Sequence, residues 1–462
     1  MASSGRARSC DRRLSSIGVR LGSHALPLSL LVIGCGGSSG GLASSHTDAG
    51  GQTPFFSDLE LGVIRAELGT LPDQPPVDST NAYADSALAA ALGEKLFFDT
   101  AYSSNGQVSC STCHIPEKGF QDDRDSTSLG LGFTGRHAPT LLNAAYGTAR
   151  SSGTVWQFWD GRKDSMWSQA LGPPESSIEM GSARSKIALL IFDKYRVDYE
   201  AAFGGPMRLM RDPATSQPLA PETAFPGRVG DPATVAWDAL PEDLRTDITR
   251  IYVNFGKALQ AYERTATFTS RNSRFDGFHK AIAAGAPDSD ELTATEKNGL
   301  KLFVGKAQCI TCHRGPNFTD QKFHNIGVLQ EGDHVPKEDN GRETGVASVK
   351  VDEFNCRSGW SDQSDIDQCA VTQLEAKAAD HGAFKTPTLR SVAHTAPYFH
   401  TGALPTLESV IEFYNAGGNP ASSGSSTDGG ATPPEPGIEP LNLSEQEKLE
   451  LIAFLKALDG KP

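Results

Sequence analysis

The chain has 462 residues, a length that predicts two or three domains, each with a core of its own. Its 47 glycines, 28 prolines and 21% charged residues fit a loop-rich globular protein and exclude a coiled coil or a collagen-like repeat. The 42 basic and 56 acidic side chains leave a formal charge of -14, and this sign argues against nucleic acid as a partner.

The first 35 residues are predicted to be an export signal rather than part of the fold. Several arginines precede a mostly apolar stretch from Leu21 to Gly34, which is too short for a transmembrane helix. The run Leu30–Cys35 resembles a bacterial lipobox, in which Cys35 would become a lipid-bearing N-terminus; an ordinary cleaved secretory signal is the alternative. We therefore expect a periplasmic protein that contacts the membrane only through a lipid anchor, with a flexible tether over residues 36–54.

A helical pattern occurs once in each half of the chain. Gly93–Phe97 and Gly299–Phe303 both read Gly-x-Lys-Leu-Phe, and each predicts the last turns of a helix. Thr293 and Glu296 form a capping box, which predicts the start of the second of these helices. Gly, Pro and Ser residues over 283–290 predict the boundary between the two halves.

Toward the C terminus, residues 417–440 are rich in Gly, Ser and Pro and are predicted to be disordered. Ser444 and Glu447 then form another capping box, and apolar residues from Leu451 to Leu458 follow at helical spacing. These patterns predict a final helix directly after the disordered stretch.

Four of the cysteines form two motifs with the same spacing. Cys110–His114 and Cys309–His313 both read Cys-x-x-Cys-His, the pattern of covalent c-type haem attachment. Two thiols one helical turn apart can reach the two vinyl groups of one porphyrin, and the adjacent His can bind its iron. A zinc site would need ligands from distant segments, and a redox dithiol gives no reason for the His. We therefore predict two c-type haems, with His114 and His313 as proximal ligands and with thioether bonds from Cys110, Cys113, Cys309 and Cys312.

The helical patterns and the haem motifs together predict a mainly α protein of two cytochrome c-like domains, with long loops and little strand. We place the N-terminal haem domain at residues 55–285 and the C-terminal haem domain at residues 286–462. The leftover cysteines, Cys356 and Cys369, flank a polar loop. In an oxidising compartment they are predicted to form a disulfide, with two unpaired thiols as the alternative.

Four further motifs carry a resemblance that runs from about residue 88 to residue 458. They are Leu96–Asp99, Arg136–Asn143, Gln157–Arg162 and Ala396–Gly402. In these motifs the sequence resembles the bacterial di-haem cytochrome c peroxidase family, including its protein-oxidising branch typified by methylamine dehydrogenase maturation enzymes. The resemblance implies an N-terminal haem that handles peroxide, a C-terminal haem that passes electrons and a Trp between the two.

The resemblance also implies roles for three residues near the first haem. Trp159 matches the Trp between the haems, and Gln169 and Glu179 follow at the spacing of the family. Glu179 is the implied acid and base, because peroxide cleavage needs a proton taken from one oxygen and delivered to the other. Gln169 would orient peroxide. Without the haem motifs, a core Trp and two surface residues would be the ordinary interpretation.

One departure from the family concerns the first haem. Leu131 stands where typical members have a His that closes this haem, and leucine cannot bind iron. We therefore predict a first haem that is open to peroxide without prior reduction, with His137 as the alternative ligand. His137 also replaces an Asn that helps members of the family to hold calcium. This replacement weakens the calcium site, and calcium stays a candidate ion only because the backbone carbonyl groups of Thr395 and Pro397, which match the other ligands of the family, could still contribute.

A second departure concerns the C-terminal haem. Typical members carry a Met fourteen residues after the position of His400, whereas this chain has Tyr414, and the protein-oxidising branch uses a Tyr from the same helix. A phenolate ligand would stabilise ferric iron and lower the reduction potential. Tyr414 is therefore the predicted metal ligand of the second haem. The alternatives are that Tyr398, His394 or His400 binds this iron, or that no residue does.

Three classes of function are compatible with these residues. The first is a peroxidase that takes electrons from a small cytochrome c or cupredoxin donor and passes them from the C-terminal haem to the N-terminal haem, where hydrogen peroxide is reduced to water. The second is peroxide-driven oxidation of residues on a partner protein. The third is a non-enzymatic electron carrier, which is disfavoured because it would have two closed haems. We predict the peroxidase, and a homodimer is compatible with the sequence.

Overall fold

The computed structural model describes residues 54–147, 155–418 and 434–460. The predicted export signal, nearly all of the tether and most of the Gly/Ser/Pro-rich stretch lie outside these residues, so those expectations stay predictions. The described residues belong to one unit, Pro54–Pro462. In this part of the chain, no helix combines the length and the apolar character that crossing a membrane would require.

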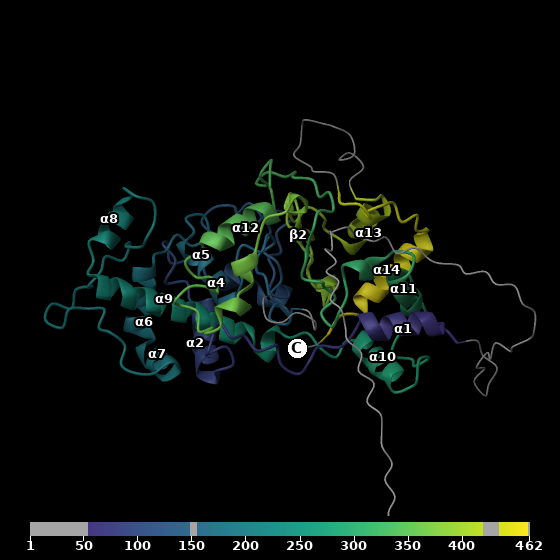
Figure 1. Ribbon diagram of the computed structural model, residues 1–462, viewed down its shortest axis with the longest axis horizontal. Coiled ribbons are helices and arrows are strands. Elements are labelled where there is room, and N and C mark those ends of the chain that lie inside the picture. The colour runs from purple at the N-terminus through teal and green to yellow at the C-terminus, as the bar shows by residue number, and fades with distance from the viewer. Residues whose placement is uncertain (1–53, 148–154, 419–433, 461–462) are drawn as a thin grey trace, which may run out of the picture. The chain divides into compact units, whose positions relative to one another are not determined.

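Helices make up most of the regular structure (Figure 1). The α-helices up to residue 263 are α1 (Asp58–Glu67), α2 (Ala87–Phe98), α3 (Cys110–Cys113), α4 (Met166–Ala170), α5 (Gly172–Glu175), α6 (Arg184–Lys194), α7 (Arg196–Phe203), α8 (Pro232–Asp238) and α9 (Glu242–Glu263). The α-helices that follow are α10 (Arg274–Ala283), α11 (Ala294–Val304), α12 (Arg342–Val351), α13 (Leu407–Asn415) and α14 (Glu445–Lys456). The strands described are β1 (Phe323–His324) and β2 (Phe384–Lys385), which pair antiparallel. The prediction of a mainly α protein with little strand is confirmed.

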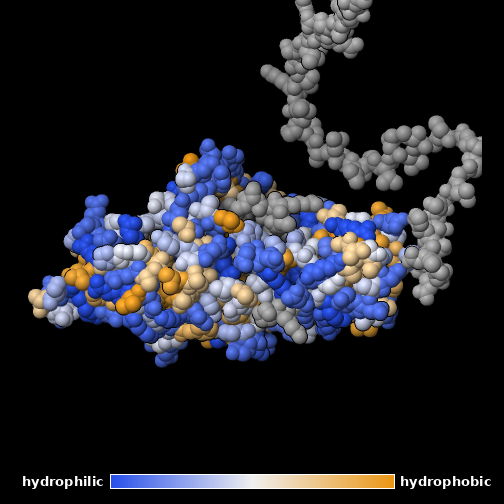
Figure 2. Space-filling model, turned by 90° about the horizontal axis from the view of Figure 1, so that it is seen from below, coloured by the Kyte–Doolittle hydropathy of each residue, from blue (hydrophilic) through white to orange (hydrophobic). Residues whose placement is uncertain are grey.

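Two large hydrophobic clusters form the cores. The first cluster contains residues of α2, α4, α6 and α9, whereas the second contains residues of α1, α10, α11, α13 and α14. On the face drawn in Figure 2, hydrophobic residues form separate patches within a mostly hydrophilic surface. Most of the large apolar side chains of the described residues are buried. Each core lies beside one Cys-x-x-Cys-His motif, since Cys110 packs against the first and Cys309 against the second.

The repeated Gly-x-Lys-Leu-Phe motif has the same packing role in both cores. A Cβ atom on Gly93 would collide with the backbone carbonyl of Ala258, because α2 and α9 pack closely there. A Cβ atom on Gly299 would collide in the same way with the backbone carbonyl of Glu450, where α11 meets α14. The glycines of the repeat therefore allow two helices to cross at close range in each half of the molecule.

The helices α11 and α14 of the second core begin where the sequence predicts. The hydroxyl of Thr293 accepts a hydrogen bond from the backbone of Glu296 at 3.3 Å, and the Glu296 carboxylate accepts one from the backbone of Thr293 at 2.9 Å. Ser444 and Glu447 make the same reciprocal bonds before α14. Both predicted capping boxes are confirmed, and each satisfies backbone N–H groups that have no partner within the helix.

Two segments assigned to the first domain pack in the second core instead. Apolar residues of α1 and of α10 belong to the second hydrophobic cluster, where both helices lie against elements of the C-terminal half. The cores are therefore built from segments that are not contiguous in the chain.

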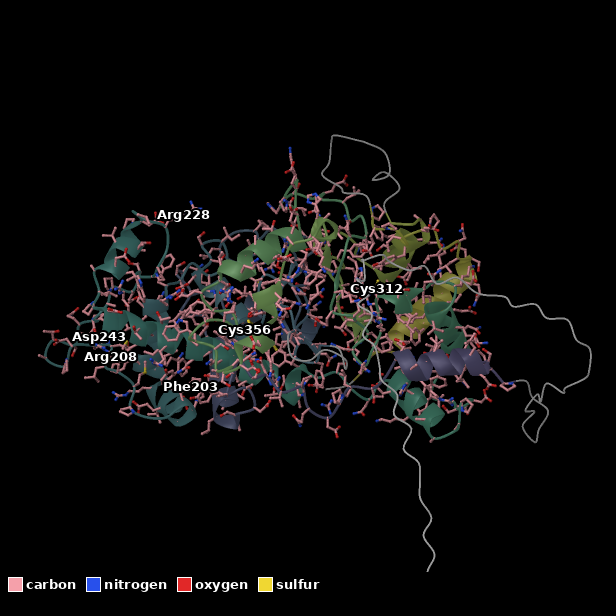
Figure 3. All side chains as sticks on the ribbon, in the orientation of Figure 1. Phe203, Arg208, Arg228, Asp243, Cys312 and Cys356 are labelled. Atoms are coloured by element: carbon pink, nitrogen blue, oxygen red, sulfur yellow. A yellow bond between two sulfur atoms is a disulfide. The ribbon has the colours of Figure 1, made fainter. Side chains whose placement is uncertain are left out.

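The predicted disulfide between Cys356 and Cys369 is present, with the two Cα atoms 5.6 Å apart. It is buried in a small cluster with Val349 (Figure 3 labels Cys356).

Candidate functional site

The first haem motif forms a short helical turn with two free, half-buried thiols. Cys110 and Cys113 are the first and last residues of α3, and burial raises the pKa of each thiol to about 12. The Nδ1 atom of His114 lies 3.0 Å from the carbonyl oxygen of Phe120, and burial lowers the pKa of this imidazole. A neutral ring that donates from Nδ1 leaves Nε2 free to bind a metal, so this site fits a c-type haem.

The second haem motif repeats this arrangement. Cys309–Thr311 forms a short 3-10 helix, and the Nδ1 atom of His313 lies 3.0 Å from the carbonyl oxygen of Phe318. Burial lowers the pKa of the His313 ring, which again favours the neutral form with a free Nε2. The thiol groups of Cys309 and Cys312 are free as well (Figure 3 labels Cys312). Both motifs therefore present two thiols and one oriented imidazole.

A cavity of about 730 Å³ lies at the first haem motif. It is lined by Cys110, Cys113 and His114 together with the three residues predicted to act there, which are Trp159, Gln169 and Glu179. A volume of this size is within the range of cofactor and ligand pockets. The structure thus brings together, in one cavity, the predicted haem attachment residues and the predicted peroxide residues.

Glu179 is a half-buried carboxyl group at the wall of this cavity. Burial raises its pKa above the ordinary value, and the charge of Arg162 and a hydrogen bond from the Ser176 hydroxyl oppose that rise. A raised pKa places the group nearer to neutral pH, where it can both accept and return a proton. Glu179 therefore has the environment of a general acid and base.

Arg162 is a site residue that the sequence analysis did not single out. It lines the cavity, binds Asp160 with 3.1 Å contacts, and lies 3.6 Å over the ring of Phe158. These contacts hold a positive charge close enough to Glu179 to act on its pKa. The available signal was its place at the end of the Gln157–Arg162 motif, which was used only to recognise the family.

The loop around Leu131 is attached to the segment that carries Glu179. The backbone N–H of Leu131 donates to the carbonyl of Glu179 at 2.9 Å, and that of Gly132 donates to the carbonyl of Ile178 at 2.8 Å. The Leu131 side chain is 37% exposed and is not part of the cavity wall. His137 does line the cavity, and its Nε2 atom is buried without a hydrogen-bond partner, so His137 stays the alternative ligand.

Trp159 is held between two loops that are far apart in the sequence. Its indole N–H donates to the carbonyl of His137 at 2.8 Å, and the backbone N–H of His137 donates to the carbonyl of His400 at 2.7 Å. The rings of Trp159 and His400 are 6.4 Å apart in an edge-to-face arrangement. Since the Trp159 carbonyl also accepts from the backbone of Lys385, the position of this indole is fixed from several sides.

Tyr414 lies on α13, near the second haem motif. Burial raises the pKa of its hydroxyl, and the neighbouring Cys312 and Cys309 raise it further. The residue is half-buried, and its hydroxyl lies close enough to the two thiols for their charges to act on its pKa. Tyr414 therefore stays the candidate ligand of a haem attached at this motif.

The other candidate ligands of the second haem are engaged elsewhere. The hydroxyl of Tyr398 donates to a backbone carbonyl at 2.9 Å. His394 is 65% exposed and pairs with Asp459 at 3.0 Å. The Nε2 atom of His400 accepts a hydrogen bond from Gln330 at 2.8 Å, and its ring stacks on that of Phe384. Each alternative would have to give up these contacts to bind iron.

The expected calcium ligands do not fit calcium. The side-chain amide of Gln121 donates hydrogen bonds to the carbonyl oxygens of both Thr395 and Pro397, at 2.6 and 3.1 Å. His137 supplies nitrogen rather than oxygen, and calcium prefers oxygen ligands. The expectation that these two carbonyls could hold the ion is therefore corrected, because an N–H donor already occupies them.

Comparisons with known proteins point to one family. Residues 87–283 match a model of the family described as di-haem cytochrome c peroxidase. The chain is 30% identical over 408 residues to the cytochrome-c peroxidase IdrP2 of Denitromonas iodatirespirans, and this alignment covers 86% of each chain. It is 30% identical over 324 residues to the cytochrome c551 peroxidase of Pseudomonas aeruginosa, covering 69% of each.

Relatives of a second kind match over a similar length. The methylamine utilization protein MauG of Methylorubrum extorquens is 28% identical over 445 residues, covering 95% of this chain and 96% of the relative. Among solved structures, a MauG-like protein associated with microbial copper homeostasis has a TM-score of 0.55 at 27% identity, covering 84% of this chain and 94% of that one. At these identities the comparisons do not assign the chain to one kind of relative rather than the other.

Proposed function

We propose, for a chain that belongs to the di-haem cytochrome c peroxidase family, that it reduces hydrogen peroxide to water at the first haem motif with electrons that arrive through the second. The observation that carries this proposal is the cavity that Trp159, Gln169 and Glu179 share with His114. A non-enzymatic carrier has no need of a carboxyl group with a raised pKa in such a cavity.

The residues of the cavity divide the proton chemistry between them. A c-type haem attached there supplies the iron that accepts peroxide and exchanges electrons. Glu179 would take the proton from one peroxide oxygen and return it to the other, which leaves as water, so this transfer consumes no net proton. The remaining oxygen becomes a second water with two electrons from the donor and two protons from solvent. Gln169 orients the bound molecule through its side-chain amide.

Trp159 carries electrons between the two haem motifs in this proposal. Its indole is fixed by the His137 carbonyl and lies against the His400 ring, so it offers a rigid aromatic step toward the first cavity. Trp159→Phe should leave peroxide binding intact and slow electron delivery, measured by stopped-flow absorption. Trp360→Phe, outside the cavity wall, is the matched control. An unchanged rate in Trp159→Phe would remove this residue from the path.

The electron donor is proposed to be a small cytochrome c or a cupredoxin. The formal charge of -14 favours association with a basic donor at low salt. Oxidation of a reduced basic cytochrome c on addition of peroxide should therefore slow as the salt concentration rises. A rate that does not depend on salt would point to an uncharged docking surface or to another class of donor.

A second candidate function is oxidation of residues on a partner protein. Tyr414 beside Cys309 and Cys312 favours it, because a phenolate ligand would lower the potential of the second haem. In that case, the spectrum produced by peroxide without a donor should persist for minutes in the wild type and decay quickly in Tyr414→Phe. Fast decay in both proteins would leave peroxide reduction as the function.

The cellular location is proposed from the N-terminal sequence. The run that ends in Cys35 supports export and lipid attachment at that residue. Cys35→Ala should move the protein from the membrane fraction to the periplasmic fraction of the producing cell. Release of the wild-type protein into the periplasmic fraction would instead indicate an ordinary cleaved signal.

A further inference from the structure

Gln121 joins two segments that lie far apart in the sequence. Its Nε2 atom donates hydrogen bonds to the carbonyl oxygens of Thr395 and Pro397, at 2.6 and 3.1 Å. Gln121 as a whole is only 5% exposed. A side-chain amide carries two N–H hydrogens, so one is available for each carbonyl. The junction between these segments is thus satisfied by one buried, uncharged side chain.

A cation could not share this position with the amide. Calcium binds six to eight oxygen atoms at 2.3–2.6 Å, and its ligands must turn their oxygen lone pairs toward the ion. Here the lone pairs of Thr395 and Pro397 face N–H groups instead. The opposite orientation of the Gln121 amide would bring three oxygens together without an N–H donor, an arrangement that a cation would stabilise. The metal content of the protein therefore distinguishes the two orientations.

On one side, Gln121 is part of the loop that orients the first proximal ligand. It directly follows Phe120, whose carbonyl accepts the hydrogen bond from the Nδ1 atom of His114. The Gln121 carbonyl also accepts from the backbone of Ile115, the residue after that His, at 3.2 Å. A shift of Gln121 would therefore be transmitted to the orientation of the His114 ring.

On the other side, Gln121 anchors the loop that packs against Trp159. Thr395 and Pro397 precede His400, whose carbonyl accepts from the backbone of His137 and whose ring meets the indole of Trp159. The contacts of Gln121 thus connect the loop that orients His114 with the loop that packs against Trp159 on the wall of the first cavity.

We propose that Gln121 takes the place of a divalent cation at this junction, so that the protein folds and holds its first haem site in position without calcium. Gln121 acts as a positioning residue that holds the His114 loop and the loop ending at His400 in fixed relation. The proposal concerns the architecture of this chain and does not depend on which substrate the protein oxidises.

The first test uses the purified holoprotein. We expect no calcium in the metal analysis after dialysis, and the same melting temperature and the same haem absorption spectrum in millimolar EDTA and in millimolar CaCl2. One calcium per chain, or a melting temperature that falls in EDTA, would overturn the proposal. Since this measurement needs no substitution, it stands even if the variants below do not fold.

Two variants test the position itself. In Gln121→Glu, a carboxylate faces two carbonyl oxygens, so the melting temperature should fall in EDTA and recover when CaCl2 is added. Gln121→Ala should lose stability and change the spectrum of the first haem, because the loop of His114 is released. Gln260→Ala, a buried amide bonded to Asn81 away from the junction, should lose stability without any response to calcium.

The variants also have an outcome that contradicts the proposal. If Gln121→Glu is as stable in EDTA as the wild type, the two carbonyls do not form a position that a cation can fill. If Gln121→Ala changes neither the melting temperature nor the haem spectrum, the amide does not hold the junction. Either result would reduce the Gln121 contacts to ordinary packing.

Discussion

The two haem motifs share a scaffold and differ in what lies near it. In each, an imidazole donates to a Phe carbonyl at 3.0 Å, and a glycine lets two helices of the adjacent core cross closely. The first motif opens into a cavity of about 730 Å³ with Glu179 on its wall, whereas Tyr414 lies near the thiols of the second. The repeated motifs therefore give both sites the same arrangement for attaching a haem. The two sites differ in Glu179 and Tyr414, which lie outside the repeated motifs.

The largest expected effect tests the first half of this comparison. Glu179→Gln removes the carboxylate and keeps the shape of the side chain, so peroxide turnover should fall by about 100- to 10,000-fold. The absorption of the second haem should not change. The matched control is Glu117→Gln, on an exposed turn near the same motif, which should keep full activity. Turnover near the wild-type level in Glu179→Gln would transfer the proton role to another group.

The second half of the comparison is tested by Tyr414→Phe, which removes only the hydroxyl. If that hydroxyl binds the second iron, the reduction potential of this haem should rise by roughly 0.1 V or more, because axial ligands shift haem potentials over a wide range. Tyr398→Phe is the control, since its hydroxyl is bonded to Val392. Equal potentials in all three proteins, measured by spectroelectrochemical titration, would exclude Tyr414 as a ligand.

The shared scaffold is tested by adding one methyl group to each half. Gly93→Ala and Gly299→Ala should each lower the free energy of unfolding by about 1–3 kcal/mol or more, because the new Cβ atom overlaps a backbone carbonyl. Gly62→Ala, where nothing lies near the added methyl group in α1, should instead stabilise by about 0.5–1 kcal/mol. Chemical denaturation measures all three. A large loss in only one of the first two variants would break the symmetry of the cores.

The smallest expected effect concerns pH. Glu179 accepts a proton only when it is ionised, so peroxide turnover should rise with pH through the pKa of this group. Burial raises this pKa, and the charge of Arg162 lowers it. Arg162→Gln removes the opposing charge, and the acid limb of the pH–rate profile should move to higher pH. A limb that stays in place would mean that another group controls it.

Local patterns predicted the parts of the site that depend on spacing along the chain. The Cys110–His114 and Cys309–His313 motifs, the capping box at Thr293 and the Cys356–Cys369 pair all act over a few residues or through one bond, and the structure contains them as expected. Chemistry of this kind is visible in a sequence because the interacting atoms belong to neighbouring positions.

Contacts over long sequence separations could not be predicted in this way. Gln121 and Thr395 are 274 positions apart, and nothing in the pattern around either residue indicates the other. The packing of α1 with the second core is similar, since its amphipathic pattern shows that one face is buried but does not identify the partner. Both contacts join segments that no local pattern connects.

The most direct test of the account is the reaction of the fully oxidised protein with one equivalent of hydrogen peroxide in the absence of any reductant, followed by stopped-flow visible and near-infrared absorption. The family resemblance implies that Leu131 stands at the position of the closing His, and its side chain is not part of the cavity wall, so we predict a rapid spectral change. If no reaction occurs until one haem is reduced, a ligand such as His137 closes the first site. That result would contradict an open peroxide cavity in the oxidised protein.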